Sequence, residues 1–85
     1  MATKYDLETW LTEALKALGG SGRIASICKH VWEAHEAELR DSGELFYTWQ
    51  YDIRWAAQRL SQQGVMKSKR LSPRGVWELR KPIKA

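Results

Sequence analysis

Two stretches of this sequence hold residue types that could bind a metal or act as a nucleophile. Cys28, His30 and His35 are metal-ligating types. On a helix, however, residues 28 and 30 point about 200° apart and residues 30 and 35 about 140° apart, so these side chains would not converge on one ion. Ser26 and Lys29 match the Ser-x-x-Lys pattern of serine acyl-enzymes, but the partner motifs of those enzymes are missing. Neither stretch therefore predicts a metal site or an activated nucleophile.

A glycine-rich stretch, Gly-Gly-Ser-Gly at residues 19–22, has the composition of a phosphate-binding loop. It follows an expected helix rather than a strand, and it lacks the Gly-Lys-Ser/Thr ending of such loops, so we interpret it as a helix cap and turn. Glu33, Glu36 and Glu38 are typical of a solvated acidic surface rather than of an acid–base pair. The sequence therefore predicts a non-catalytic protein with no metal and no cofactor.

Basic residues are concentrated near the carboxyl end. The chain has 85 residues and a formal net charge of +4. Residues 1–66 hold seven lysines and arginines against nine acids, a net charge of −2, whereas residues 67–85 hold seven against Glu78 alone, a net charge of +6. A concentrated positive field attracts polyanions such as nucleic acid, or an anionic lipid surface. A solvated basic tail that binds nothing is the alternative.

Three amphipathic helices are expected to position these residues. Apolar residues recur at the i, i+3, i+4 spacing of a helix in three segments. Asp6 is expected to cap the first helix at its amino end, Gly19 and Gly20 to end it, and Gly64 to end the last. The expected helices cover residues 5–18, 25–35 and 45–63, with a further helical turn around residues 36–40.

Two runs near the carboxyl end, residues 65–71 and 76–80, alternate apolar and polar side chains and predict a hairpin. Residues 72–75, Ser-Pro-Arg-Gly, suit a type I turn between them. The hairpin is expected to complete a small sheet with a short extended segment at Arg23 and Ile24. This element order is that of the winged helix, a helix-turn-helix variant, so the predicted fold class is α+β, with three helices and a small antiparallel β-hairpin wing.

The third expected helix has a polar stripe. With Trp49 and Ile53 taken as the buried direction, steps of about 100° per residue place this stripe on the opposite side. Arginine can contact guanine and glutamine can contact adenine, while tyrosine hydroxyls bind phosphates. The stripe could instead dock another protein, or serve only as a solvated face. The candidate DNA-contacting residues of this helix are Tyr47, Gln50, Tyr51, Arg54 and Gln58.

The expected hairpin carries cations around its turn. Alternation places Lys67 and Lys69 on one face of its first strand and Arg70 on the other. These side chains fit phosphates beside a groove, and Arg74 at the turn can reach into a narrow minor groove. For the two lysines the alternative is protection of an exposed edge strand from aggregation. Lys67, Lys69, Arg70 and Arg74 are therefore the candidate contacts of the wing, and neutralising about five phosphates predicts a salt slope of about −4.5.

Three segments, LTEALKALGGSGRIASICKHV (11–31), YDIRWAAQRLSQQGVMKS (51–68) and SPRGVWELR (72–80), together resemble the amino-terminal domain of Mrr-type restriction endonucleases. The resemblance spans about residues 7–80. It implies a winged-helix DNA-recognition module from a system that attacks modified DNA, with Trp55 packed under the wing. In that family the module is joined to a nuclease domain, for which 85 residues leave no room, so DNA cleavage is not expected.

Together these observations predict a non-catalytic module that binds double-stranded DNA, with residues 45–63 as recognition helix and residues 65–80 as wing. It would belong to a restriction or defence system, with a nuclease or another protein as a further partner. The alternatives are a protein–protein interaction adaptor, with the face of Tyr47 and Tyr51 as its patch, or a transcriptional regulator of the same fold. No heptad pattern or extra helix indicates a dimer, so the oligomeric state stays open.

Length and composition predict one small domain over residues 1–80, followed by a basic tail at residues 81–85. The single cysteine, Cys28, excludes an intramolecular disulfide and favours a reducing compartment. The chain has no apolar run near the roughly 20 residues of a membrane span and no signal-peptide pattern. We therefore expect a cytoplasmic protein without a membrane partner.

Overall fold

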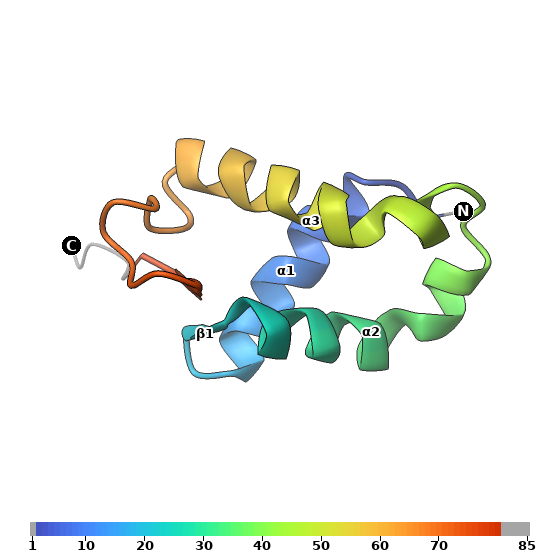
Figure 1. Cartoon of the computed structure of the whole chain (residues 1–85), viewed down its shortest axis with the longest axis horizontal. Helices are drawn as coiled ribbons and strands as arrows, with labels where there is room; N and C mark the ends of the chain where they lie inside the picture. Colours follow the sequence, from blue (N-terminus) through green and yellow to red (C-terminus); the bar gives the residue numbers. More distant parts are fainter. Residues whose placement is uncertain (1, 81–85) are drawn as a thin grey trace.

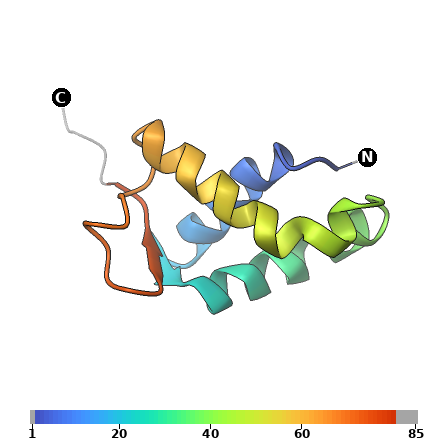
Figure 2. The same ribbon diagram turned by 45° about the horizontal axis from the view of Figure 1, so that its top comes forward.

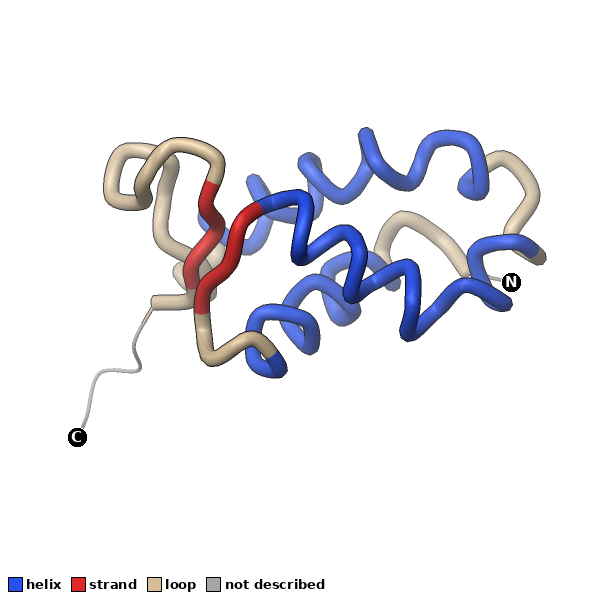
Figure 3. The backbone as a smooth tube through the Cα atoms, turned by 60° about the horizontal axis from the view of Figure 1, so that its bottom comes forward, coloured by secondary structure: helices blue, strands red, loops and turns tan. Residues whose placement is uncertain are grey.

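Three helices and a two-stranded antiparallel sheet form the fold in the computed structural model, which describes residues 2–80. The sheet lies at one end of the helices, where the tube in Figure 3 brings the two strands side by side. The predicted α+β class is thus confirmed, and the expected tail at residues 81–85 lies outside the described residues. In chain order (Figure 1) the elements are α1 Asp6–Ala17, β1 Ser21–Arg23, α2 Ile24–Arg40, α3 Leu45–Gln62 and β2 Val76–Glu78.

The amino end of α1 differs from the expectation. Asp6 is the first helical residue, Tyr5 occupies the cap position, and no side chain caps the helix. The prediction of Asp6 as N-cap was wrong because residues 3–5 already form a turn, in which the Asp6 backbone N–H donates to the Thr3 carbonyl at 3.0 Å. The Asp6 carboxylate instead accepts a hydrogen bond from the Thr3 backbone N–H at 2.9 Å and ties this turn to the helix.

The carboxyl end of α1 is where the glycine pair was expected. Gly19 and Gly20 have φ angles of 86° and 102°, in the region that glycine adopts without steric cost. The Gly20 backbone N–H donates to the Leu15 carbonyl at 2.7 Å and satisfies one of the last free carbonyls of the helix. The chain therefore reverses direction here and enters β1.

The second helix is longer than predicted and is interrupted. α2 joins the expected helix and the expected turn into Ile24–Arg40, with a non-helical φ of −130° at His35. Ile27 and Val31 bury one face before this kink, and Leu39 is buried after it. Ile24, expected to be extended, instead begins α2, because the strand ends at Arg23.

The third helix matches its prediction to within one residue. At about 1.5 Å per residue, α3 is about 27 Å long. It ends before Gly64, which has a φ of 81° and donates its backbone N–H to the Ser61 carbonyl at 3.1 Å. Neither α3 nor another helix within residues 2–80 is both long and apolar enough to cross a membrane.

The sheet pairs the last strand with the short extended segment before α2, as the sequence predicts. β1 and β2 are antiparallel, with Ser21 opposite Glu78 and Arg23 opposite Val76. The Ile24 backbone N–H extends the pairing with a 3.0 Å hydrogen bond to the Gly75 carbonyl. The expected contact between the last strand and the extended segment before α2 is therefore confirmed.

The expected hairpin is much shorter than predicted. Residues 65–67 do return against residues 78–80, with Met66 opposite Leu79 and the Lys67 backbone N–H donating to the Glu78 carbonyl at 2.9 Å. Beyond Lys67 no strand forms, because the chain turns at once: the Leu71 and Ser72 backbone N–H groups both donate to the Ser68 carbonyl. The alternation predicted to place Lys67 and Lys69 on one strand face therefore does not hold.

The core lies between the three helices. Trp49 is buried as expected, and so is Trp10 on α1. The apolar spacing of the sequence predicts Trp32 in the core as well, but Trp32, like Trp55 and Trp77, is partly exposed and packs against the edge of the core. Met66 adds a buried side chain from the segment after α3 and so fixes this segment on the helices. The other buried apolar residues are Leu7, Leu11, Ala14, Leu15, Ile27, Val31, Leu39, Leu45, Ile53, Ala56, Ala57 and Leu60.

Candidate nucleic-acid interface

The polar stripe of α3 is exposed along its length. Tyr47 is 83% exposed and Tyr51 78%, which is unusual for side chains with such large apolar rings. From Tyr47 to Gln58 the stripe is about 16 Å long, enough for several base-pair steps of about 3.4 Å. All of its predicted residues lie on the solvent side, namely Tyr47, Gln50, Tyr51, Arg54 and Gln58.

The opposite side of α3 holds the stripe in place. Trp49, Ile53, Ala56 and Leu60 are buried there against α1 and α2. Successive helical residues are about 100° apart, so burial of this face directs the polar stripe outward. The stripe is therefore presented by a rigid, well-packed helix rather than by a loop.

Arg54 lies near α2 as well as on the stripe. Burial raises the pKa of the Cys28 thiol above its ordinary value, and the Arg54 guanidinium partly offsets this rise by favouring the thiolate. Arg54 has no ion pair among the described residues. The charge of Arg54 thus acts on the Cys28 thiol of α2, although the Arg54 side chain is exposed.

An aromatic cluster joins α2 to the amino end of α3. The Trp32 ring stacks on Trp49 with 6.1 Å between ring centroids and lies 6.3 Å from Phe46. The Arg40 guanidinium lies 5.2 Å from the Trp32 ring and forms a 2.8 Å ion pair with Glu36. Tyr47 packs edge-on against Phe46 at 5.0 Å. We call this cluster the aromatic end, made of Trp32, Arg40, Phe46, Tyr47 and Trp49.

The other flank of α3 contacts the amino-terminal segment. Trp55, expected under the wing, has its edge-on ring contact with Tyr5 at 5.5 Å. The Lys4 ammonium lies 4.4 Å from the Trp55 ring centroid, and the Arg59 guanidinium lies 5.1 Å from it. Arg59 also forms a 3.0 Å ion pair with Glu8. Sequence reasoning missed these partners because about 50 residues separate them along the chain and no local pattern links them.

The loop after α3 carries exposed cations. We call residues 68–75 the basic loop, and its Lys69, Arg70 and Arg74 are exposed with no ion pair within residues 2–80. Lys67, just before it, is half-buried, and its ammonium lies 3.6 Å from Glu78 Oε1. Of the four cations predicted for the wing, three therefore have no acidic partner within the described part of the chain, and one is paired.

The structure brings the basic loop to the carboxyl end of α3. Figure 2 shows the loop beyond this end of the helix and beside the sheet. The Ser61 hydroxyl of α3 donates to the Lys67 carbonyl at 3.2 Å and anchors the start of the segment. Arg54 and Gln58 thus lie nearer the loop than Tyr47, which is at the other end of the helix.

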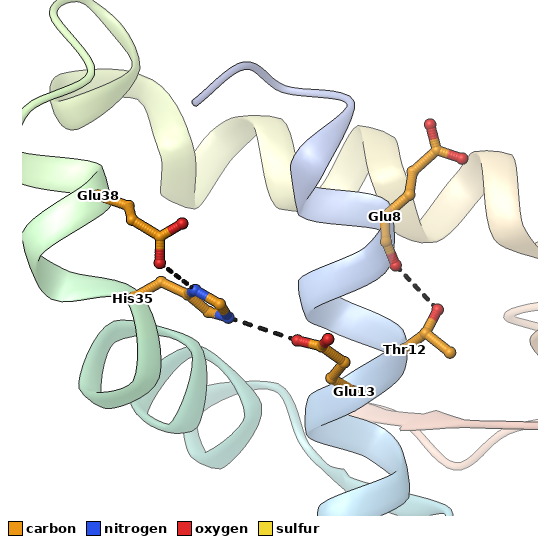
Figure 4. A network of polar contacts seen from close by, with 5 residues as sticks. All are labelled: Glu8, Thr12, Glu13, His35 and Glu38. Atoms are coloured by element: carbon orange, nitrogen blue, oxygen red, sulfur yellow. Dashed lines mark hydrogen bonds and ion pairs between the residues drawn. The ribbon is translucent and has the colours of Figure 1, made fainter. Parts of the chain in front are cut away.

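His35 takes part in a polar network away from the stripe. In Figure 4 its ring lies between carboxylates from two helices, with Nδ1 2.7 Å from Glu38 Oε1 and Nε2 3.4 Å from Glu13 Oε1. The ring also stacks on Trp10 with 4.0 Å between centroids. The network joins α1 to α2 at the kink. Within residues 2–80 no group of three or more His, Cys, Asp or Glu side chains could hold a metal ion.

Comparison with known proteins found no family model, no curated protein and no solved structure that matches this chain. The resemblance to the amino-terminal domain of Mrr-type restriction endonucleases therefore stays a prediction from the sequence.

Proposed function

We propose that this protein is a non-catalytic, double-stranded DNA-binding module of the winged-helix type. α3 would enter the major groove through its polar stripe, and the basic loop would act as a short wing on the flanking phosphates. This proposal joins a helix that can read base edges to a set of cations that can hold the backbone.

The observation that carries the proposal is the pairing state of the cations. Arg54, Lys69, Arg70 and Arg74 have no acidic partner within the described residues, whereas Lys67, Arg40 and Arg59 each have one. A free cation can bind a phosphate without first losing an intramolecular ion pair. These four free cations lie on the polar stripe and the basic loop, next to one another, which is a distribution that suits a polyanion. Lys4, Lys16, Arg23, Lys29 and Arg80 also have no ion pair within residues 2–80, so the clustering of free cations, and not the lack of a partner alone, supports this surface.

The position of each side chain would decide whether it contacts bases or phosphates. Tyr51, Arg54 and Gln58 would contact bases or the sugar–phosphate edge next to them, with Gln50 beside them. Lys69, Arg70 and Arg74 would hold phosphates together with Tyr47. The contribution of Lys67 would be smaller than its charge suggests, because Glu78 already offsets that charge.

A protein-interaction adaptor is the second candidate function. It is supported by the aromatic end, where largely exposed Tyr47 packs edge-on against partly exposed Phe46, and Phe46 lies beside partly exposed Trp32. Aromatic residues and arginine are enriched in protein interfaces. A role as transcriptional regulator, a place in a restriction system and a cytoplasmic location stay predictions from the sequence.

Fluorescence anisotropy of a labelled duplex of about 25 base pairs tests the proposal. The double variant Arg54→Gln, Arg74→Gln is expected to bind the duplex more weakly. Loss of the base contact of Arg54 alone should cost about 1–3 kcal/mol of binding free energy. Lys16→Gln is the matched control, because Lys16 is an exposed cation of α1 that belongs neither to the polar stripe nor to the basic loop. Equal affinity of the double variant and the wild type would overturn the contact assignment. A partner protein that co-purifies after nuclease treatment, with no duplex binding at low salt, would favour the adaptor.

A further inference from the structure

The amino-terminal segment brings a free cation to the side of α3. The Lys4 ammonium lies over the Trp55 ring, at 4.4 Å from its centroid. Lys4 is exposed and has no ion pair among residues 2–80. Arg59 lies on the same ring but is neutralised by Glu8 at 3.0 Å. Lys4 is therefore the cation of this flank whose charge is available to a ligand.

Helix geometry places this cation beside the polar stripe. At about 100° per residue, Trp55 points about 70° away from the mean direction of Tyr47, Tyr51, Arg54 and Gln58. A helix with its side chains is about 10–12 Å in diameter, and the major groove is about 12 Å wide. When the stripe faces the floor of the groove, a side chain about 70° away faces a wall of it, and the walls carry the phosphates.

We propose that residues 2–5 form a phosphate-contacting arm, in which Lys4, held over Trp55, binds one backbone of the duplex that α3 enters. This inference rests on the proposed DNA binding and extends it to a part of the chain that is remote from the basic loop in sequence. The arm and the loop would then contact the backbone from two separate places, which fixes the orientation of the helix in the groove.

The arm is ordered before a ligand arrives. Tyr5 packs edge-on against Trp55 at 5.5 Å, and the Asp6 carboxylate accepts the Thr3 backbone N–H at 2.9 Å. The cation–π contact holds the Lys4 ammonium without using up its charge. Less conformational entropy is therefore lost when Lys4 binds a phosphate than for a lysine on a free chain end.

The test compares Lys4→Gln, Lys4→Arg and the control Lys16→Gln in duplex binding across a salt series, with thermal unfolding measured for each. Loss of one phosphate contact is expected to make the salt slope of Lys4→Gln shallower by about 0.9. Between about 50 and 200 mM salt, the wild-type affinity would then fall about 3.5-fold more than that of Lys4→Gln. Lys4→Arg is expected to keep the wild-type slope because it keeps the charge.

The outcomes separate this inference from the proposed function. Wild-type protein that does not bind the duplex at low salt overturns both. Wild-type binding with equal slopes for Lys4→Gln and wild type overturns the arm and leaves the proposed function standing. A lower melting temperature of Lys4→Gln without a change of slope assigns Lys4 a structural role and also overturns the arm.

Discussion

The basic loop and the aromatic end lie at opposite ends of α3, and they differ in whether their cations have an acidic partner. In the loop, Lys69, Arg70 and Arg74 extend into solvent without acidic partners in the described part of the chain. At the aromatic end, Arg40 is held over the Trp32 ring at 5.2 Å and bonded to Glu36 at 2.8 Å. One end offers charge to a ligand, and the other uses its charge for internal packing.

The comparison indicates that both the position and the pairing of a cation bear on where a polyanion would bind, since Lys16, Arg23 and Lys29 also have no ion pair within residues 2–80 but lie on other elements. Lys67 illustrates this within the wing segment, because it lies next to the basic loop but 3.6 Å from Glu78. Exposed ion pairs contribute little to stability. They do, however, lower the net positive charge that a phosphate would meet, and so the free cations of the polar stripe and the basic loop are the predicted contacts.

The largest expected effect is on folding at the aromatic end. Trp49 is 4% exposed and stacks on Trp32, so Trp49→Ala should lower the free energy of unfolding by about 3–5 kcal/mol. Leu71 in the basic loop is 69% exposed, and Leu71→Ala should change the free energy of unfolding by less than about 0.5 kcal/mol. Urea unfolding measures both. Similar losses for the two variants would refute the contrast between a packed end and a solvated end.

The second effect is on DNA binding by the loop. Replacing Lys69, Arg70 and Arg74 together by glutamine should make the salt slope shallower by about 2.7, with the unfolding free energy nearly unchanged. Arg40→Gln removes one exposed but paired cation, from the other end of α3, and should leave the slope close to wild type. Anisotropy over a salt series measures this. If Arg40→Gln changed the salt slope by one third of the change seen in the triple variant, a paired cation would contribute as much to DNA binding as a free one, which contradicts the prediction.

The smallest effect concerns Arg54, midway between the two ends. Because burial raises the pKa of Cys28, its alkylation by iodoacetamide should need a higher pH than that of a free cysteine. Arg54→Gln removes the charge that favours the thiolate, so the pKa should rise further and alkylation near pH 8 should slow. Arg74→Gln is the control. Equal rates in the two variants would argue against the proximity of Arg54 and Cys28.

Local patterns in the sequence were enough to predict the helices and the exposed stripe. The apolar spacing around Trp49 and Ile53 identifies the buried side of α3, and the stripe follows by rotation about the helix axis. Gly19, Gly20 and Gly64 mark helix ends through their backbone freedom, which needs no tertiary information.

Contacts between distant residues could not be predicted in this way. The strand over residues 65–71 was predicted from alternation, but its extent depends on backbone hydrogen bonds to the Ser68 carbonyl that alternation does not encode. The Lys4–Trp55 contact and the Arg59–Glu8 ion pair depend on how α1 packs against α3. For the site, residue types were therefore predictable, but which cations are free was not.

Chemical-shift mapping of the ¹⁵N-labelled protein during titration with an unlabelled duplex tests the central claim most directly. If α3 and the basic loop form one interface, the amide signals of residues 50–58 and 67–75 shift together and saturate at one stoichiometry. The amide signals of residues around Lys16, on the exposed side of α1, should not shift. Absence of shifts at low salt, or shifts confined to the aromatic end, would contradict the proposal that α3 and the basic loop form one DNA interface.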